Sequence, residues 1–299
     1  MAVMLKSGLK TLAVNAVGDY GGSVVRYMIE SGTNVVGHVA PGREEALIDG
    51  LPRYASIEEA VAATGAKAAV VYTPAAGVRD SLLEAANAGL ELVFAAAEFV
   101  PVHDVAYAAA AAREAGMWVV GPNSLGMATP GQAVLGAMPS DFVQPGRLGM
   151  VGRSGTLTLN MCRLLTNEGI GQSTIVHVGG DVICGRNPHE WLQRFLDDPD
   201  TDAVLYTGEP GGGKEYAMLE TIASARKPVV ALIVGRNSPR GKVMGHAGAL
   251  VGADRDTAAA KSAALRDAGA HVVNSPLDVA SKLKELLPAL SRSEAEALA

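Results

Sequence analysis

His246 stands in the stretch RGKVMGHAGALVG, residues 240–252, where glycines and small or aliphatic side chains surround it. A histidine that ligates a metal usually has His, Cys, Asp or Glu partners within a few residues, and this stretch has none. A core histidine usually lies among larger side chains on a helix or strand. We therefore expect an accessible imidazole on a glycine-rich loop.

Two other stretches offer chemistry of a matching kind. Glu209 lies in YTGEPGGGKE, where several glycines follow an expected strand, a setting that an ordinary solvated glutamate does not need. The stretch GRSGT, residues 152–156, joins an expected strand to an expected helix, so Ser154, Gly155 and Thr156 could bind an anion at the helix N-terminus. The alternative is an ordinary Ser/Thr helix cap.

All three stretches follow expected parallel strands, so their side chains could meet at one edge of a sheet. A carboxylate that holds a neutral imidazole in one tautomer prepares it to attack phosphorus, and the helix N-terminus could stabilise the transferred phosphoryl group. A serine-hydrolase triad is a competing use of such groups. The chain has no GxSxG motif to support that use.

A glycine-rich turn, VGDYGGSVV, lies between the first expected strand and the first helix. Its small residues would let backbone N–H groups reach a phosphate, although the spacing is G-x-x-G-G and a tight structural turn is the alternative. About 20 residues on, where an NAD site has an acid, the sequence GHVAPGREE offers His38 and Arg43. An arginine there suits a phosphorylated ribose, as in NADP or coenzyme A.

Short aliphatic runs alternate with helical segments along most of the chain, which predicts an α/β fold with two doubly wound parallel sheets. The first series of strands is expected at 11–17, 34–39, 67–73, 90–96 and 117–121, and the alternation restarts at 147. The Pro- and Gly-marked residues between the series, 126–146, are predicted to connect domains at 1–125 and 147–299.

The composition narrows the class of protein. The 299 residues carry a formal charge of -6 without any Lys/Arg run, which argues against nucleic acid and membrane as partners. The chain shows no membrane-length apolar run and no signal-peptide pattern. Cys162 and Cys184 stand far apart, which suits a reducing cytosol and two buried thiols. We expect a cytoplasmic protein.

The stretch GKVMGHAGALVG resembles the phosphohistidine loop of the succinyl-CoA synthetase α subunit, whose pattern is GKxMGHAGA. GRSGTLT, GIGQSTIVHVGGD, GEPGG and GPNSLGMATPG resemble further blocks of this family, and the resemblance covers nearly the whole chain. It implies a Rossmann-like CoA-binding domain, a flavodoxin-like phosphohistidine ligase domain, and an ADP-forming acid–CoA ligase.

The resemblance also implies roles for individual residues. His246 would be transiently phosphorylated, Glu209 would orient it, and Ser154, Gly155 and Thr156 would bind the phosphate. Coenzyme A would contact Gly18, Gly21, Gly22, Ser23, Pro41, Arg43, Pro74, Ala96, Ala97, Glu98 and Asn123. ATP or GTP with Mg²⁺ would bind a separate ATP-grasp β subunit, in an αβ or α2β2 assembly. This chain has no P-loop GxxxxGK[ST] and no expected metal site.

Several positions depart from the family pattern. The family's TPGKGG is here APGREE, with Arg43 in place of a lysine, and the first glycine loop is shorter than GFTGSQG. Ser124 and Leu125 replace Cys-Pro, and Leu159 replaces a tyrosine near the family's acyl substrate. We therefore expect phosphoryl and CoA chemistry with a small carboxylic acid other than succinate as the best substrate. The alternatives are a citryl-CoA or malyl-CoA synthetase small subunit, a non-catalytic CoA-binding regulatory protein, and an NADP oxidoreductase.

Overall fold

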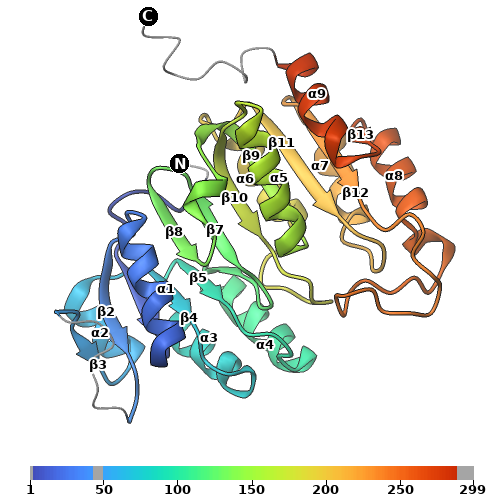
Figure 1. Cartoon of the computed structure of the whole chain (residues 1–299). Coiled ribbons are helices and arrows are strands. Elements are labelled where there is room, and N and C mark those ends of the chain that lie inside the picture. Colours follow the sequence, from blue (N-terminus) through green and yellow to red (C-terminus); the bar gives the residue numbers. More distant parts are fainter. Residues whose placement is uncertain (1–2, 43–49, 288–299) are drawn as a thin grey trace, which may run out of the picture. The chain divides into compact units, whose positions relative to one another are not determined.

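The computed structural model describes residues 3–42 and 50–287 (Figure 1). The chain divides into two compact units. The N-terminal unit comprises Met4–Met138 and Ile183–Arg186, and the C-terminal unit comprises Pro139–Val182 and the residues from Asn187 on. Each unit is built on its own parallel sheet.

The sheet of the N-terminal unit has the strand order β3-β2-β1-β4-β5-β6, which is the order of the Rossmann fold. Valine and alanine dominate its strands, whose side chains are buried on both faces, as in parallel sheets covered by helices. The strands are β1 (Thr11–Val14), β2 (Val35–Val39), β3 (Arg53–Tyr54), β4 (Ala68–Val71), β5 (Leu92–Ala95) and β6 (Trp118–Val120).

Helices cover both faces of this sheet. The helices are α1 (Gly18–Glu30), α2 (Ile57–Thr64), α3 (Val78–Asn87) and α4 (Val102–Glu114), with a short 3-10 turn η1 (Ala75–Gly77) before α3. Helices α2, α3 and α4 share one hydrophobic core with Leu12, Val71 and Val93 of the strands. Helix α1 packs on the other face with an antiparallel hairpin, β7 (Gly126–Thr129) and β8 (Ala133–Gly136).

The short segment Ile183–Arg186 belongs to the N-terminal unit, although the residues on either side of it belong to the C-terminal unit. The Arg186 guanidinium lies 4.6 Å from the ring centroid of Trp118 and donates to the Met117 carbonyl at 3.1 Å. The Gly185 amide donates to the Gly121 carbonyl at 2.8 Å. The chain therefore passes from one unit to the other more often than its linear sequence indicates.

The parallel strands of the C-terminal unit follow the order β13-β12-β11-β9-β10. Numbered along the chain this is 2-1-3-4-5 read from the β10 side, the order of flavodoxin-like sheets. The strands are β9 (Pro145–Gly152), β10 (Gln172–His177), β11 (Ala203–Gly208), β12 (Val229–Ile233) and β13 (His271–Val273). This order places β9, β10, β11 and β12 side by side, so their carboxyl ends share one edge.

Helices cover this second sheet on both faces (Figure 1). Helices α5 and α9 contact each other on one face, while α6, α7 and α8 form a contiguous row on the other. Their bounds are α5 (Gly155–Asn167), α6 (Pro188–Asp197), α7 (Leu219–Ala223), α8 (Ala258–Asp267) and α9 (Pro276–Leu286), with 3-10 turns η2 (Ser140–Phe142), η3 (Tyr216–Met218) and η4 (Asp254–Asp256).

Local sequence signals mark where several helices begin. Ser154 caps α5 by accepting a hydrogen bond from the Leu157 amide at 3.4 Å. The Glu190 carboxylate accepts one from the Asn187 amide at 2.8 Å before α6, where Pro188 occupies the first helical position. Such caps satisfy N–H groups that have no partner within the helix.

The α/β fold with two doubly wound sheets is confirmed. Each strand expected in the first series overlaps an observed one, with ends shifted by a few residues. The sequence did not indicate the two-residue strand β3. Residues 126–146, predicted as a connection, contain the β7–β8 hairpin and the beginning of β9. No helix among the described residues has the length and hydropathy to cross a membrane.

Candidate active site

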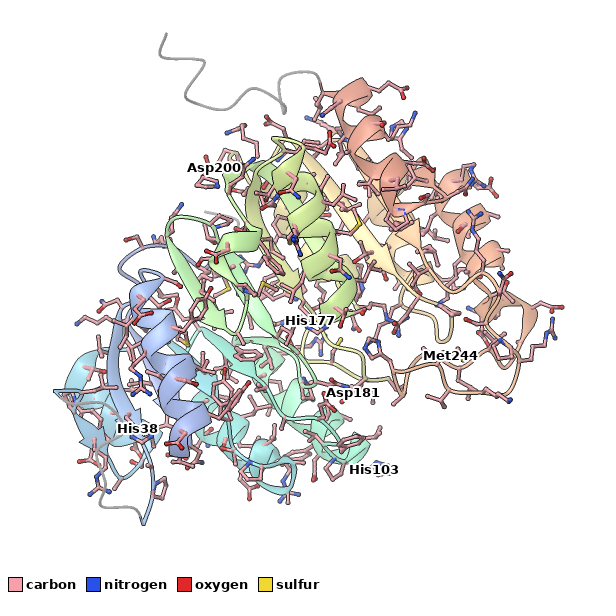
Figure 2. All side chains as sticks on the ribbon, in the orientation of Figure 1. His38, His103, His177, Asp181, Asp200 and Met244 are labelled. Carbon is pink, nitrogen blue, oxygen red and sulfur yellow. The ribbon has the colours of Figure 1, made fainter. Side chains whose placement is uncertain are left out.

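The carboxyl edge of the C-terminal sheet gathers the residues that the sequence singled out for phosphoryl chemistry. Gly152 at the end of β9 pairs with Thr207 of β11, so Arg153 and Glu209 follow the two strands at the same edge. The loop with His246 follows β12, which pairs with β11 up to Gly208. Figure 2 labels His177, Asp181 and Met244, which lie on β10 and on two of the loops at this edge.

The imidazole of His246 meets the carboxylate of Glu209. The distance from Nδ1 to Oε2 is 2.8 Å, with 24% of the histidine side chain exposed and 7% of the glutamate side chain. An ionised carboxylate can only accept, so Nδ1 carries the proton and the neutral ring presents Nε2 as its basic atom. The hydrogen bond that His246 donates to Glu209 raises the pKa of His246 and outweighs the effect of partial burial.

Three glycines allow the loops to come this close. A Cβ added to Gly180 would lie 2.6 Å from Cγ and Cδ2 of His246. One added to Gly211 would lie 2.2 Å from the Gly248 carbonyl oxygen, and one added to Gly248 would lie 2.8 Å from Nη2 of Arg153. Side chains at these positions would push the histidine loop away. The glycines around His246 therefore serve packing at this edge.

Arg153 connects the strand edge to Glu209. Its guanidinium is buried, and Nη2 lies 3.1 Å from Oε1 of Glu209. This positive charge lies beside the carboxylate that accepts the hydrogen bond from Nδ1 of His246. Arg153 was missed from the sequence, although it stands inside the GRSGT stretch. As the one charged residue in that stretch, it offered a signal that could have identified it.

The three residues predicted to bind phosphate lie at the beginning of α5. Ser154 is the cap, Gly155 is buried, and Thr156 is exposed. Their position directly after β9 puts the positive end of the α5 dipole at the same sheet edge as Glu209. The interpretation of Ser154 as a helix cap is confirmed, and α5 begins at the candidate site. The binding of phosphate by Ser154, Gly155 and Thr156 stays a prediction.

His177 is the last residue of β10 and lies at the same edge, but its surroundings differ from those of His246. Its Nε2 lies 2.9 Å from the carbonyl oxygen of Arg153. Burial lowers the pKa of His177 to about 4, which keeps the ring neutral at physiological pH, so Nε2 is the donor to this carbonyl. The two histidines at one edge therefore show opposite pKa shifts.

The N-terminal unit gathers most of the residues predicted to bind coenzyme A at the carboxyl edge of its own sheet. Gly18, with φ +69°, begins α1 after β1, and an added Cβ on Gly21 would lie 2.2 Å from the carbonyl carbon of Ala16. Gly22 leaves room for a Cβ, and the Ser23 hydroxyl donates to the Tyr20 carbonyl within α1. The helix therefore begins in close contact with the end of the first strand.

The remaining predicted CoA-binding residues follow neighbouring strands. Pro74 follows β4, and Ala96, Ala97 and Glu98 follow β5. The Asn123 amide donates to the Ala97 carbonyl at 2.8 Å, which joins the loops after β5 and β6. Pro41 lies in the exposed turn after β2. Arg43 lies outside the described residues.

Backbone strain is concentrated at this edge. Among the described residues, the non-glycine residues with positive φ are Asn15 at 52°, Phe99 at 60° and Asn123 at 52°. They follow β1, β5 and β6, respectively. Residues in such sparsely populated conformations cluster at ligand-binding sites more often than elsewhere. The strain therefore supports the choice of this edge as a binding site.

The three positions predicted to lie near the acyl substrate belong to different units. Ser124 and Leu125 lie in the N-terminal unit, where the Ser124 hydroxyl accepts a hydrogen bond from the Gly126 amide at 2.9 Å. Leu159 lies on α5 in the C-terminal unit and is partly exposed. No group of three or more His, Cys, Asp and Glu residues suited to a metal ion occurs within 3–42 and 50–287.

Comparison with known proteins assigns both units of the chain to known domain families. The CoA-binding domain family matches residues 14–99, and the CoA-ligase family matches residues 151–271. Succinate–CoA ligase [ADP-forming] subunit alpha 1 of Archaeoglobus fulgidus is 41% identical over 287 residues, which cover 96% of this chain and 99% of the relative. The chain belongs to the succinate–CoA ligase α-subunit family.

Further members and a solved structure agree with this. The α subunit of succinate–CoA ligase [ADP-forming] from Aquifex aeolicus is 37% identical over 299 residues, covering 99% of this chain and 98% of the relative. ATP citrate lyase of Methanosaeta concilii in complex with (3S)-citryl-CoA superposes with a TM-score of 0.86 at 25% identity. That match covers 97% of this chain and 51% of the longer lyase chain. As a member of the family, the chain is part of a CoA ligase.

The contact between Gly180 and His246 generates a direct test. We expect Gly180→Ala to displace the imidazole from Glu209, because the new methyl group would overlap the ring. A displacement of about 1 Å can reduce the rate of a positioned reaction roughly 10²-fold. The measurement is the rate of the predicted phosphate transfer from labelled ATP to His246, in the presence of the predicted partner subunit.

Gly213→Ala is the matched control, because Gly213 lies in the same glycine-rich loop as Glu209 and has open space around an added Cβ. It should leave the rate near that of the wild type. A Gly180→Ala protein that is phosphorylated as fast as Gly213→Ala would contradict the packing argument.

Proposed function

We propose that this chain is the α subunit of an ATP-dependent, ADP-forming carboxylic acid–CoA ligase that works through a phosphohistidine at His246. The observation that carries the proposal is the 2.8 Å contact between Nδ1 of His246 and Oε2 of Glu209. It fixes the tautomer in which Nε2 is the nucleophile. A non-catalytic CoA-binding regulatory protein would not need this arrangement.

The reaction follows in three displacements. Nε2 of His246 attacks the γ-phosphorus of the nucleotide, ADP leaves, and Glu209 stabilises the positive charge that develops on the ring. A carboxylate oxygen of the acid then attacks the phosphorus, so an acyl phosphate forms and the imidazole is released. The CoA thiolate finally attacks the acyl carbon, and phosphate leaves with the electrons of the broken C–O bond.

The nucleotide site belongs, in this proposal, to an ATP-grasp β subunit that binds ATP or GTP with Mg²⁺. The absence of a P-loop motif in this sequence supports that division of labour. The assembly would be αβ or α2β2. The thiols of Cys162 and Cys184 are both buried and the two residues stand far apart in the sequence, which favours the cytoplasm as the place of action.

Coenzyme A is proposed to bind the carboxyl edge of the N-terminal sheet, where α1 begins at Gly18. The helix N-terminus and the glycine turn suit a pyrophosphate. Arg43 would contact the 3'-phosphate of the ribose, since a guanidinium forms charge-assisted hydrogen bonds with phosphate oxygens. This role is assigned from the sequence.

The acid is proposed to be a small carboxylic acid other than succinate. Leu159 offers no hydroxyl donor where the family pattern has a tyrosine. Ser124 and Leu125 replace the family's Cys-Pro in a second stretch that is predicted to face the acyl group. The second candidate function is a citryl-CoA or malyl-CoA synthetase small subunit, which uses the same chemistry on a hydroxy acid. The structural similarity to a citryl-CoA complex of ATP citrate lyase supports keeping this candidate.

The phosphoenzyme gives the first test of this proposal. With its partner and labelled ATP, the chain should acquire an acid-labile, base-stable phosphate that His246→Ala abolishes. Glu209→Gln should slow phosphorylation roughly 10²-fold, a size typical of lost orienting and base effects. Labelling that persists in His246→Ala would rule out the assignment.

The pH dependence of this step follows from the raised pKa of His246. Nε2 can attack only while the ring is neutral, so the rate should increase as the pH rises through that pKa. In Glu209→Gln the carboxylate charge is gone and the pKa of His246 falls. The increase should therefore occur at lower pH, with a reduced plateau. A pH–rate profile unchanged in midpoint would show that Glu209 does not set this pKa.

A second experiment concerns coenzyme A. The wild-type chain should bind CoA more tightly than dephospho-CoA, and Arg43→Ala should remove most of the difference. A charge-assisted hydrogen bond of this kind contributes roughly 1.5–3 kcal/mol. Calorimetry with both ligands measures the difference in affinity. The control is substitution of the exposed Arg79, which pairs with Asp80 and Asp104. Equal affinities in the wild type would exclude a contact between Arg43 and the 3'-phosphate.

The third experiment compares acids. A panel of succinate, malate, citrate, sulfoacetate and longer monoacids should show one acid at least ~10-fold better than succinate in kcat/KM, the effect expected when a buried donor to the substrate is lost. Leu159→Tyr should then raise kcat/KM for succinate relative to the preferred acid. If succinate is the best substrate of the wild type, the partner subunit determines the choice.

A further inference from the structure

A cluster of buried charges lies behind Glu209 and is not part of the proposed reaction. It contains Arg153 after β9, Glu215 after the glycine-rich loop, and Lys261 on α8, whose side chains are exposed by 1%, 1% and 0%. Together with Glu209 these residues supply two cations and two carboxylates. Buried charges are tolerated when they are paired and hydrogen-bonded in this way.

The ammonium group of Lys261 is saturated by acceptors from the segment that carries Glu209. It donates to the Glu209 carbonyl at 2.9 Å, to the Gly211 carbonyl at 2.5 Å, and to Oε2 of Glu215 at 2.5 Å. A lysine has three N–H donors, and three acceptors meet them here. Lys261 therefore fixes the backbone on which the Glu209 side chain stands.

Arg153 approaches the same segment from the other side. Its Nη1 lies 3.3 Å from the Gly211 carbonyl oxygen and 3.2 Å from Oε1 of Glu215, while Nη2 lies 3.1 Å from the Glu209 carboxylate. The hydroxyl of Tyr206 donates to the same Oε1 of Glu215 at 2.7 Å. Glu215 thus lies between two cations that would otherwise repel each other.

The electrostatics agree with this arrangement. Burial alone would raise the pKa of Glu215, but the positive charges of Arg153 and Lys261 outweigh it and lower that pKa. Burial lowers the pKa of Lys261, and the Glu215 carboxylate opposes that shift. Glu215 is therefore ionised, and its charge keeps both cations at the Glu209 segment.

The segment needs such fixation because it has little structure of its own. Glu209 is followed by Pro210 and three glycines, of which Gly211 and Gly212 have positive φ. Glycine adopts many backbone conformations, so the sequence alone does not define the direction of the Glu209 side chain. The contacts of Lys261, Arg153 and Glu215 define it.

We propose that Lys261 and Glu215 are positioning residues for phosphate transfer at His246, because they hold the Glu209–Gly211 segment so that Oε2 of Glu209 reaches Nδ1 of His246. The inference rests on the proposed function of His246, and it assigns a role to two residues whose ion pair is hydrogen-bonded to the Glu209–Gly211 segment. They act through Glu209, and Arg153 completes the connection.

The experiment uses the charge-balanced double variant Lys261→Met/Glu215→Gln. It removes one cation and one anion of the cluster and leaves Arg153 paired with Glu209, so no single buried charge is left alone. We expect phosphoenzyme formation from labelled ATP, with the partner present, to be roughly 10²-fold slower, the order of effect of a misplacement near 1 Å. CoA affinity should be unchanged.

Two readouts separate positioning from a general structural role. The titration of His246, followed by NMR in the α chain alone, should have its midpoint at lower pH in the double variant, as in Glu209→Gln. The double substitution added to Glu209→Gln should slow phosphorylation by less than about threefold further, because residues that act as one unit are not additive. An unchanged titration midpoint or a fully additive loss would overturn the proposal.

Lys227→Met is the matched control. Its ammonium also binds backbone carbonyls, those of Phe195 at 3.1 Å and of Asp198, but it precedes β12 at the opposite edge of the same sheet. It should lower Tm and leave phosphorylation unchanged. If the double variant fails to fold, Tyr206→Phe takes its place, because it removes only the hydroxyl group that donates to Glu215. It should still lower the His246 midpoint, and an unchanged midpoint there would equally contradict the proposal.

The NMR titration also distinguishes failure of this inference from failure of the proposed function. It needs neither nucleotide nor partner, so it reports on positioning even if the wild type acquires no phosphate. A wild type without label would reject the phosphohistidine, whereas a labelled wild type with an unaffected double variant would reject only the role of Lys261 and Glu215.

Discussion

The candidate site of the C-terminal unit depends on one contact, the hydrogen bond between Nδ1 of His246 and Oε2 of Glu209. The two residues stand on loops after neighbouring strands and can meet only if those loops pack closely. Gly180, Gly211 and Gly248 remove the side chains that would keep them apart. Parallel strands alone would bring the loops to one edge, and the glycines bring them within hydrogen-bond distance.

The electrostatics of this edge explain why one histidine there is suited to chemistry and another is not. His246 faces a carboxylate, which raises its pKa, whereas burial beside the Arg153 carbonyl lowers the pKa of His177 to about 4. A carboxylate would support the charged ring formed in the proposed phosphorylation of His246, and a carbonyl in a buried site would do so far less. The chemical difference between the two rings comes from the carboxylate partner of His246 and from the burial of His177.

The sequence was sufficient to predict the two doubly wound sheets, because short aliphatic strands alternate with helices and glycines in a regular way. It also predicted that Glu209 and His246 would approach each other, since both follow strands of one parallel sheet. Lys261 was missed for a physical reason. It lies on α8, some fifty residues beyond Glu209, and in sequence it is an ordinary lysine within a helix. Only the folded chain shows that its ammonium is buried against the Glu209 carbonyl.

The most direct test of the central contact is the position of phosphate on the imidazole ring. ³¹P and ¹⁵N NMR of the denatured phosphoenzyme, prepared with the partner subunit and ATP, distinguishes phosphate on Nε2 from phosphate on Nδ1. Because Glu209 occupies Nδ1, we predict phosphate on Nε2 alone. Phosphate on Nδ1 would show that the hydrogen bond to Glu209 is not maintained during the reaction, and it would contradict the account.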